Sequence, residues 1–208
     1  MSLVTFDGHS FLIDGRRIWL VSGSMPYARI PRQCWSARID AARRAGLNCL
    51  SVDAPWFLHE PASGKFDFEG DLDIRAYIGL IAECGMACIL RPGPHLGNGW
   101  DGGALPAWLT ADPTVTPRST HRQHPRFLEA TGRYFAALMD QVRDLQATST
   151  DGGPILLMQA EREWFCDPPE THASYLEELL RHLRENGCEV PVFSSEFKNL
   201  KIPFRKFF

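Results

Sequence analysis

The sharpest chemical pattern in the sequence is a pair of glutamates, Glu161 and Glu163, just after the apolar run Ile155–Met158. If the chain stays extended there, alternate residues share a face, so Gln159, Glu161 and Glu163 point one way and Arg162 the other. Carboxylates crowded near an apolar strand end raise each other's pKa, because like charges oppose joint ionisation. A general acid that works near neutral pH needs such a raised pKa. The pair therefore predicts acid–base catalysis.

A structural interpretation of the same residues stays open. Glu161 or Glu163 could pair with Arg91 or Arg162 and form a salt-bridged strand end without a catalytic role. Carboxylates are rarely buried unless they are paired with a basic residue. A structural ion pair would therefore show the same acidic and basic residues as a catalytic site. The spacing alone does not separate the two interpretations.

Histidines and cysteines offer weaker candidates. His59 and His95 lie in proline-rich segments, where a structural hydrogen bond is a simpler interpretation than catalysis. His121 and His124 are three residues apart, but no further ligands stand near them, so we expect no metal site. The six cysteines form no Cys-x-x-Cys pair and mostly lie in apolar stretches, which is typical of reduced core residues.

Tryptophans gather in the segments that follow the apolar runs. Trp56, Trp100 and Trp108 could stack on sugar rings or cover a site, since large aromatic faces suit flat ligands. Core packing is the alternative, and it is favoured for Trp108, which follows Leu105–Ala107. Arg29 could orient an acidic site residue or lie at the rim.

The elements that must position these residues follow one rhythm of short apolar runs and amphipathic segments. The runs do not alternate apolar with polar residues, which is typical of parallel strands covered on both faces. They are Ile18–Val21, Cys49–Val52, Ala87–Leu90, Ile155–Met158 and Val190–Phe193. Stripes with a period of about 3.6 residues predict helices between them. The stripes are Trp35–Ala42, Ile74–Ile81, Leu128–Leu145 and Leu176–Leu183.

This alternation predicts an α/β fold built from βα units. A doubly wound sheet and a barrel both satisfy it, but no Gly-x-Gly-x-x-Gly or Walker motif supports nucleotide binding. In a barrel, function collects where the strands end. A small hairpin, Val4–Phe6 with Phe11–Ile13, is expected before the first strand.

Composition is that of an ordinary globular protein. The chain has 208 residues, 44% hydrophobic and 23% charged, which fits a single domain over residues 1–208. The net charge of −3 provides no basic surface for nucleic acid or an anionic membrane. No apolar run approaches the roughly 18–20 residues of a membrane span. Because Met1–Asp7 has no signal-peptide pattern, we expect a soluble chain, cytoplasmic or secreted with its leader removed.

Several segments match, in order, the motifs of one enzyme family. They are Gly23–Pro31, Pro55–Pro61 with Gly64–Phe68, Arg91–Pro94, Leu105–Leu109 and Gly153–Trp164. From about residue 5 to about residue 195 the chain resembles the family 35 glycoside hydrolases, the β-galactosidases.

The resemblance implies a TIM-type (β/α)₈ barrel that hydrolyses a terminal β-galactoside with retention and uses no metal or organic cofactor. Such enzymes use two carboxylates about 5–5.5 Å apart, one as acid/base and one as nucleophile. By motif position Glu163 corresponds to the acid/base, at the end of the fourth strand. The resemblance places sugar contacts at Asp53, Trp56, Asn98, Gly99 and Arg162.

Four of these five residues, at three places in the chain, depart from the family pattern. Arg162 stands where the family usually has Asn, Asp53 replaces a Tyr, and Asn98-Gly99 replaces an Ala-Glu pair. Arginine cannot mimic asparagine, because it is larger, permanently charged and only donates hydrogen bonds. We therefore expect altered galactose recognition, and an acidic or differently substituted sugar could pair with Arg162.

The length is short for a whole barrel. A (β/α)₈ barrel typically takes about 250 residues, whereas the five runs supply about five of eight units. Residues 197–208 do not match the family, and Glu196 lies too near Glu163 in sequence to be the family nucleophile. Two functions stay open: a divergent glycosidase, or a catalytically impaired carbohydrate-binding fragment. An open sheet edge would favour a homo-oligomer in either case.

Overall fold

The computed structural model describes residues 4–97, 99–118, 125–163 and 169–195. Its central element is a parallel sheet of five strands, each paired with the next along the chain. The strands are β4 (Ser22–Ser24), β5 (Cys49–Asp53), β6 (Ala87–Gly93), β7 (Ile155–Ala160) and β8 (Val192–Phe193). A doubly wound sheet reverses its strand order at a switch point. The unbroken order seen here is that of a barrel wall, as the family resemblance predicts.

The first barrel strand differs from its prediction. The strand begins at Ser22, beyond the expected run Ile18–Val21, and Trp19 is 81% exposed. The side chain of Asn48 explains the shift, because it accepts a hydrogen bond from the Val21 N–H at 2.8 Å and donates to the Trp19 carbonyl at 2.7 Å. Together with the backbone hydrogen bond from the Asn48 N–H to the Val21 carbonyl at 3.2 Å, these bonds hold residues 19 and 21 beside Asn48, ahead of the strand.

An antiparallel sheet of three strands precedes the barrel wall. The predicted hairpin is present as β1 (Val4–Phe6) and β2 (Phe11–Ile13), and a third strand, β3 (Arg16–Ile18), extends it. Its apolar side chains pack in one cluster with Leu156 and Leu157 of β7.

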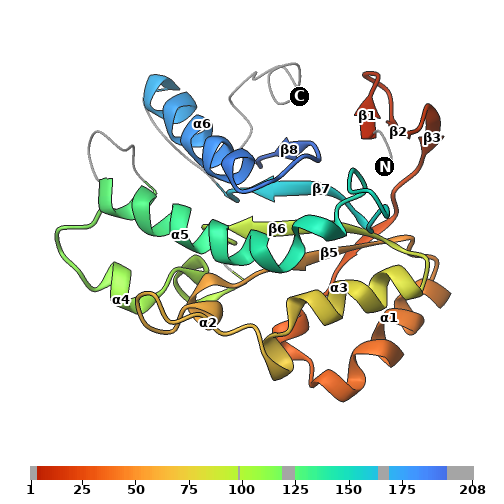
Figure 1. Ribbon diagram of the computed structural model, residues 1–208, viewed down its shortest axis with the longest axis horizontal. Coiled ribbons are helices and arrows are strands. Elements are labelled where there is room, and N and C mark those ends of the chain that lie inside the picture. Colours follow the sequence, from red (N-terminus) through yellow and green to blue (C-terminus); the bar gives the residue numbers. More distant parts are fainter. Residues whose placement is uncertain (1–3, 98, 119–124, 164–168, 196–208) are drawn as a thin grey trace.

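The four predicted helices are all present, and Figure 1 shows them around the outside of the curved sheet. They are α1 (Trp35–Arg44), α3 (Ile74–Glu83), α5 (Pro125–Val142) and α6 (Pro169–Glu185). Asp73 begins α3 by accepting a hydrogen bond from the Ala76 N–H at 2.8 Å, which satisfies a donor at the helix start. Within the described residues, no helix is long and apolar enough to cross a bilayer.

Shorter helices lie in the loops and between the longer elements. They are α2 (Trp56–His59), α4 (Ala107–Thr110) and the 3₁₀ helices η1 (Tyr27–Arg29), η2 (Arg32–Cys34), η3 (Gly70–Leu72), η4 (Asp101–Ala104) and η5 (Arg143–Leu145). Most of them follow the carboxyl ends of β4, β5 and β6, so they build the edge of the sheet at which barrel enzymes place their sites.

The main core lies between the sheet and its helices. Aromatic rings fill much of it: Tyr77 stacks on Tyr27 and meets Trp35 edge-on, with ring centroids 5.2 Å apart in both pairs. Five cysteines are described, and all are free thiols. Cys88 and Cys188 are buried in this core, Cys49 is buried on β5, and Cys34 and Cys84 are partly exposed. Cys166 lies outside the described residues.

Candidate active site

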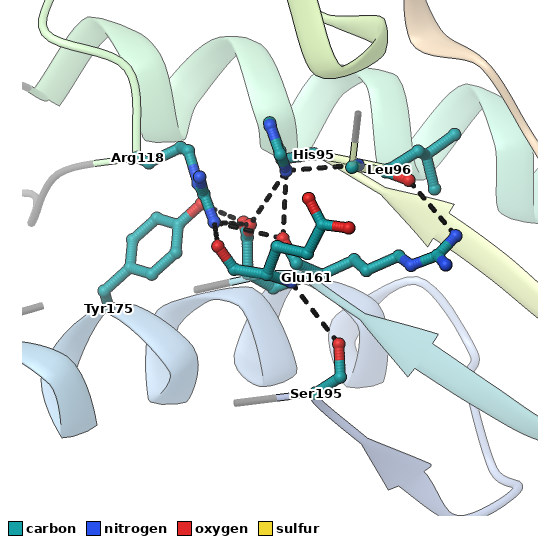
Figure 2. A network of polar contacts seen from close by, with 9 residues as sticks. His95, Leu96, Arg118, Glu161, Tyr175 and Ser195 are labelled. Atoms are coloured by element: carbon teal, nitrogen blue, oxygen red, sulfur yellow. Dashed lines mark hydrogen bonds and ion pairs between the residues drawn. The ribbon is translucent and has the colours of Figure 1, made fainter. Parts of the chain in front are cut away.

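Glu161 is the fully buried member of the glutamate pair. One of its oxygens forms an ion pair with the Arg118 guanidinium at 2.7 Å, and the other accepts a hydrogen bond from the Tyr175 hydroxyl at 2.7 Å. Burial raises the pKa of Glu161 to about 7, although Arg118 and Tyr175 both favour its charged form. Figure 2 shows these partners converging on Glu161 from different segments of the chain.

Glu163 occupies a different environment, and its side chain is only half-buried. Its backbone N–H points to the Ser195 hydroxyl at 3.4 Å, and its carbonyl accepts a hydrogen bond from Arg118 at 2.7 Å. Its carboxylate packs against Gly97, where an added Cβ would lie 2.8 Å from a carboxylate oxygen. Glu163 is thus a partly exposed residue just beyond the carboxyl end of β7.

The expected alternation along this segment is wrong beyond the strand. β7 ends at Ala160, and both glutamates have left-handed backbone angles, with φ of +65° at Glu161 and +54° at Glu163. Such angles are costly for non-glycine residues and turn the chain out of an extended path. The two glutamates therefore have different neighbours, and the raised pKa at Glu161 comes from burial rather than from a second carboxylate.

The salt-bridge interpretation is right for Glu161 but names the wrong arginine. Its partner is Arg118, while Arg91 lies 3.4 Å from Asp53. Arg118 and Tyr175 lie 43 residues before and 14 residues after Glu161, and nothing in the local sequence marks either one. Only the fold brings the three side chains together.

His95 has a structural hydrogen bond in this site. Its Nδ1 lies 2.9 Å from the Arg162 carbonyl, and burial lowers the pKa of its imidazole. Gly103, with φ of +69°, faces the ring so closely that a Cβ there would lie 2.0 Å from it. The neutral ring therefore packs between the β6 and β7 loops.

Asp53, one of the proposed sugar contacts, is bound by protein groups. It is 5% exposed and accepts a hydrogen bond from the Trp100 indole N–H at 2.9 Å. The Arg29 guanidinium lies over the Trp100 ring, 3.9 Å from its centre, and donates to the Gly99 carbonyl at 2.7 Å. Arg29 thus orients a tryptophan and a loop carbonyl.

Trp56 belongs to the core. It is fully buried, its ring stacks on Tyr134 with centroids 5.0 Å apart, and its indole N–H donates to Glu60 at 2.6 Å. A sugar-stacking role needs an exposed ring face, so the structure gives no support to Trp56 as a substrate contact. Trp108 packs edge-on against Trp56, in agreement with the core interpretation of that residue.

The remaining sequence candidates divide between described and undescribed parts of the chain. Arg162 is half-buried, and its guanidinium lies 3.4 Å from the Leu96 carbonyl. Asn98, His121, His124 and Glu196 lie outside the described residues. In the described part of the chain, no three His, Cys, Asp or Glu side chains cluster in a way that could hold a metal ion.

A sequence profile of Glycosyl hydrolases family 35 matches residues 10–202, so the match extends to residue 202 within the tail 197–208 that was expected not to match. The chain belongs to glycosyl hydrolases family 35. Relatives of this family 35 chain include human Beta-galactosidase-1-like protein 2, 42% identical over 92% of the chain, and human Beta-galactosidase, 33% identical over 93%. The chain spans 29% and 28% of the lengths of these two proteins.

Solved structures show the same fold for this family 35 chain. The exo-beta-1,4-mannosidase Op5Man5 from Opitutaceae bacterium strain TAV5 superposes with a TM-score of 0.63 at 16% identity, over 86% of the chain and 32% of the enzyme. Endo-glycoceramidase II from Rhodococcus sp. gives 0.64 at 20%, over 87% of the chain and 49% of that protein. The five-stranded sheet is thus part of a TIM-barrel architecture.

Proposed function

We propose that this chain carries the acid/base half of a retaining β-glycosidase site, with Glu163 as the general acid/base. The observation that carries the proposal is the contrast between the two glutamates after β7. Glu161 is fully buried and paired, so it cannot give a proton to a substrate, whereas Glu163 is half-buried at the carboxyl edge of the sheet. Membership of family 35 supports a carbohydrate substrate.

In this proposal Glu163 first protonates the oxygen of the departing group and then takes a proton from the attacking water. A second carboxylate about 5–5.5 Å away forms and releases the glycosyl–enzyme intermediate. Proton transfer of this kind typically accelerates a reaction by about 10²–10⁴-fold. No metal or organic cofactor has a part in these steps.

The substrate class is a terminal β-linked sugar, a galactoside or a related glycoside. Asp53 and Arg162 replace family sugar contacts, and both are held by protein groups at Trp100 and Leu96. Gly99 offers only its backbone, and its carbonyl accepts from Arg29. The sugar contacts of this chain therefore differ from those of a standard galactose pocket.

The contacts of Asp53 and Arg162 with protein groups favour a second candidate, a carbohydrate-binding chain with impaired catalysis. Side chains already engaged with the protein stabilise a transition state less well than side chains free to bind the sugar, because catalysis needs contacts that strengthen there. Binding without turnover is the property that distinguishes this candidate.

Hydrolysis of aryl β-galactosides and β-glucosides with poor and good leaving groups tests the proposal. Glu163→Gln should reduce turnover of phenyl glycosides at least about 100-fold. It should reduce turnover of dinitrophenyl glycosides much less, since that group departs without a proton. Glu129→Gln, at an exposed carboxylate on α5, is the matched control and should leave both rates unchanged.

Equal turnover by Glu163→Gln and wild type would overturn the proposal. Saturable sugar binding with no hydrolysis of any of these glycosides would favour the second candidate.

We also propose that isolated copies of this chain associate through the ends of the sheet. Among the described strands, β4 and β8 each pair on one side only. Unpaired backbone groups along a strand promote association with another chain. Light scattering tests this, and a stable monomer would contradict it.

A further inference from the structure

Arg118 is the residue that the function described so far leaves unused, and it contacts the whole Glu161–Glu163 segment. Its Nη2 lies 2.7 Å from the Glu161 carboxylate, 3.1 Å from the Arg162 carbonyl and 2.7 Å from the Glu163 carbonyl. One nitrogen thus meets three consecutive residues. These contacts come from the end of the β6 loop, far from β7 in the sequence (Figure 2).

The segment it contacts needs to be held in place. Glu161 and Glu163 both have left-handed backbone angles, which cost roughly 1–2 kcal/mol per non-glycine residue. Costly conformations persist only where surrounding contacts determine them. Other described contacts reach the same segment, among them the Glu161 N–H donating to the Gly93 carbonyl at 2.8 Å, His95 at the Arg162 carbonyl and Ser195 at the Glu163 N–H. At Glu163 the Ser195 contact is long, at 3.4 Å, so the charged contact of Arg118 with the Glu163 carbonyl is the stronger of the two.

Glu161 supplies the counter-charge that keeps the guanidinium there. Arg118 is 20% exposed and Glu161 is fully buried, so their pair is shielded from water. The Tyr175 hydroxyl from α6 holds the other carboxylate oxygen at 2.7 Å. The contacts therefore run from α6 through Glu161 and Arg118 to the backbone of Glu163.

We propose that Arg118 is a positioning residue that fixes the backbone of Glu163, and so the direction of its carboxylate, with Glu161 as the counter-ion. We call the contacts of Arg118 with the Arg162 and Glu163 carbonyls the backbone clamp. The effect of the clamp on catalysis rests on the proposed function of Glu163, whereas the clamp itself does not depend on that function. Glu161 then acts through Arg118 and does not contact the substrate.

Hydrogen exchange of backbone amides tests the clamp without any turnover. In Arg118→Ala the amides of Arg162 and Glu163 should exchange at least tenfold faster than in wild type, while the Tyr77 amide in α3 keeps its rate. Glu161→Gln should act in the same direction, because it removes the counter-ion. Arg181→Ala removes an exposed arginine that pairs with Glu178 and Glu185, and it should leave the Glu163 amide unchanged.

If Arg118→Ala does not fold, Arg118→Lys keeps the charge but loses the planar donor group, and it should still accelerate exchange at Glu163. Unchanged exchange at residues 162 and 163 in every folded Arg118 variant would overturn the clamp.

Kinetics separates this inference from the proposed function. If Glu163 is the acid/base, Arg118→Lys should lower kcat at least tenfold with an unchanged KM, since Arg118 does not touch the sugar. A loss of activity in Glu163→Gln but not in Arg118→Lys would overturn the positioning role alone. Faster exchange at Glu163 in the Arg118 variants, combined with no effect of Glu163→Gln on turnover, would support the clamp and contradict the proposed function.

Discussion

The loop after β5 and the segment after β7 both bury a glutamate, and they hold it in different ways. Glu60 takes its partners from its own loop, the Trp56 indole N–H at 2.6 Å and the Gly64 N–H at 2.7 Å. Both partners are neutral and only four residues away. The loop after β5 is therefore a local unit whose sequence specifies its own hydrogen bonds.

Glu161 depends instead on distant segments. Its partners are Arg118, at the end of the β6 loop, and Tyr175, on α6. One of them is charged, and Glu161 itself has a left-handed backbone angle. A buried carboxylate can thus be bound within one loop, as Glu60 is, or can connect distant segments, as Glu161 does. Only in the second case does the position of a neighbouring site residue depend on the whole fold.

A buried histidine completes the local unit. His59 Nδ1 lies 2.8 Å from the Asp67 carbonyl, which can only accept, so Nδ1 carries the proton. Its Nε2 then accepts from the Tyr27 hydroxyl at 2.5 Å. Burial lowers the pKa of His59 to about 4, in keeping with this neutral tautomer.

Removing the ring that packs the local unit should have the largest effect. Trp56→Ala should lower the free energy of unfolding by about 3–5 kcal/mol, because it leaves a cavity in the core and removes the hydrogen-bond donor of a Glu60 carboxylate oxygen. Urea denaturation measures this. Trp19→Ala, at an 81% exposed ring, should change it by less than about 0.5 kcal/mol. A similar loss in both variants would contradict the assignment of Trp56 to the core.

Acid should weaken the local unit through His59. Its pKa is about 4 in the folded chain and 6.5 as the ordinary value, so the unfolded chain takes up a proton first as the pH falls. Stability should therefore decrease between pH 6.5 and 4, by no more than about 3 kcal/mol for this residue. His59→Gln should flatten the decrease in denaturation series across this range. The exposed control His9→Gln should keep it.

The segment after β7 should respond to pH with the opposite sign. The pKa of Glu161 is about 7 in the folded chain against an ordinary 4.5, so its contribution is complete below pH 4.5 and is lost as the pH rises through 7. The loss is at most about 3 kcal/mol. Denaturation of Glu161→Gln should lack this decrease, and the exposed control Glu129→Gln should retain it. Equal slopes for Glu161→Gln and wild type would contradict the assignment.

A methyl group at Gly97 should produce the smallest of these effects. Gly97 has φ of +85°, and an added Cβ would lie 2.8 Å from a Glu163 oxygen. Gly97→Ala should therefore cost about 1–2 kcal/mol. Gly79→Ala, in α3 with open space around it, should instead stabilise by about 0.5–1 kcal/mol. Thermal denaturation of the two variants checks the opposite signs.

Much of the fold could be predicted because it depends on local patterns. The four helix stripes and four of the five apolar runs lie in or overlap the helices and the parallel strands expected of them. The exception is Ile18–Val21, where Asn48 holds the backbone and displaces the first strand. The third strand of the N-terminal sheet was not predicted, because Arg16–Ile18 has little apolar pattern of its own.

The candidate site was less predictable for a physical reason. Glu161 and Glu163 could be picked out because they follow an apolar run, but the difference between them depends on Arg118 and Tyr175. Nothing near the glutamates in sequence indicates those contacts, nor the two left-handed residues that end the alternation. Local patterns predict which residues reach the sheet edge, and long-range contacts decide which of them stays accessible.

The buried thiols give the chain its own set of unfolding reporters. Cys49 on β5, Cys88 on β6 and Cys188 before β8 are buried, and burial raises the pKa of each thiol. A thiol-reactive reagent can modify them only after the core opens, because the thiolate is the reactive form. Peptide-resolved labelling rates would therefore time the opening of the barrel wall strand by strand, without any engineered probe.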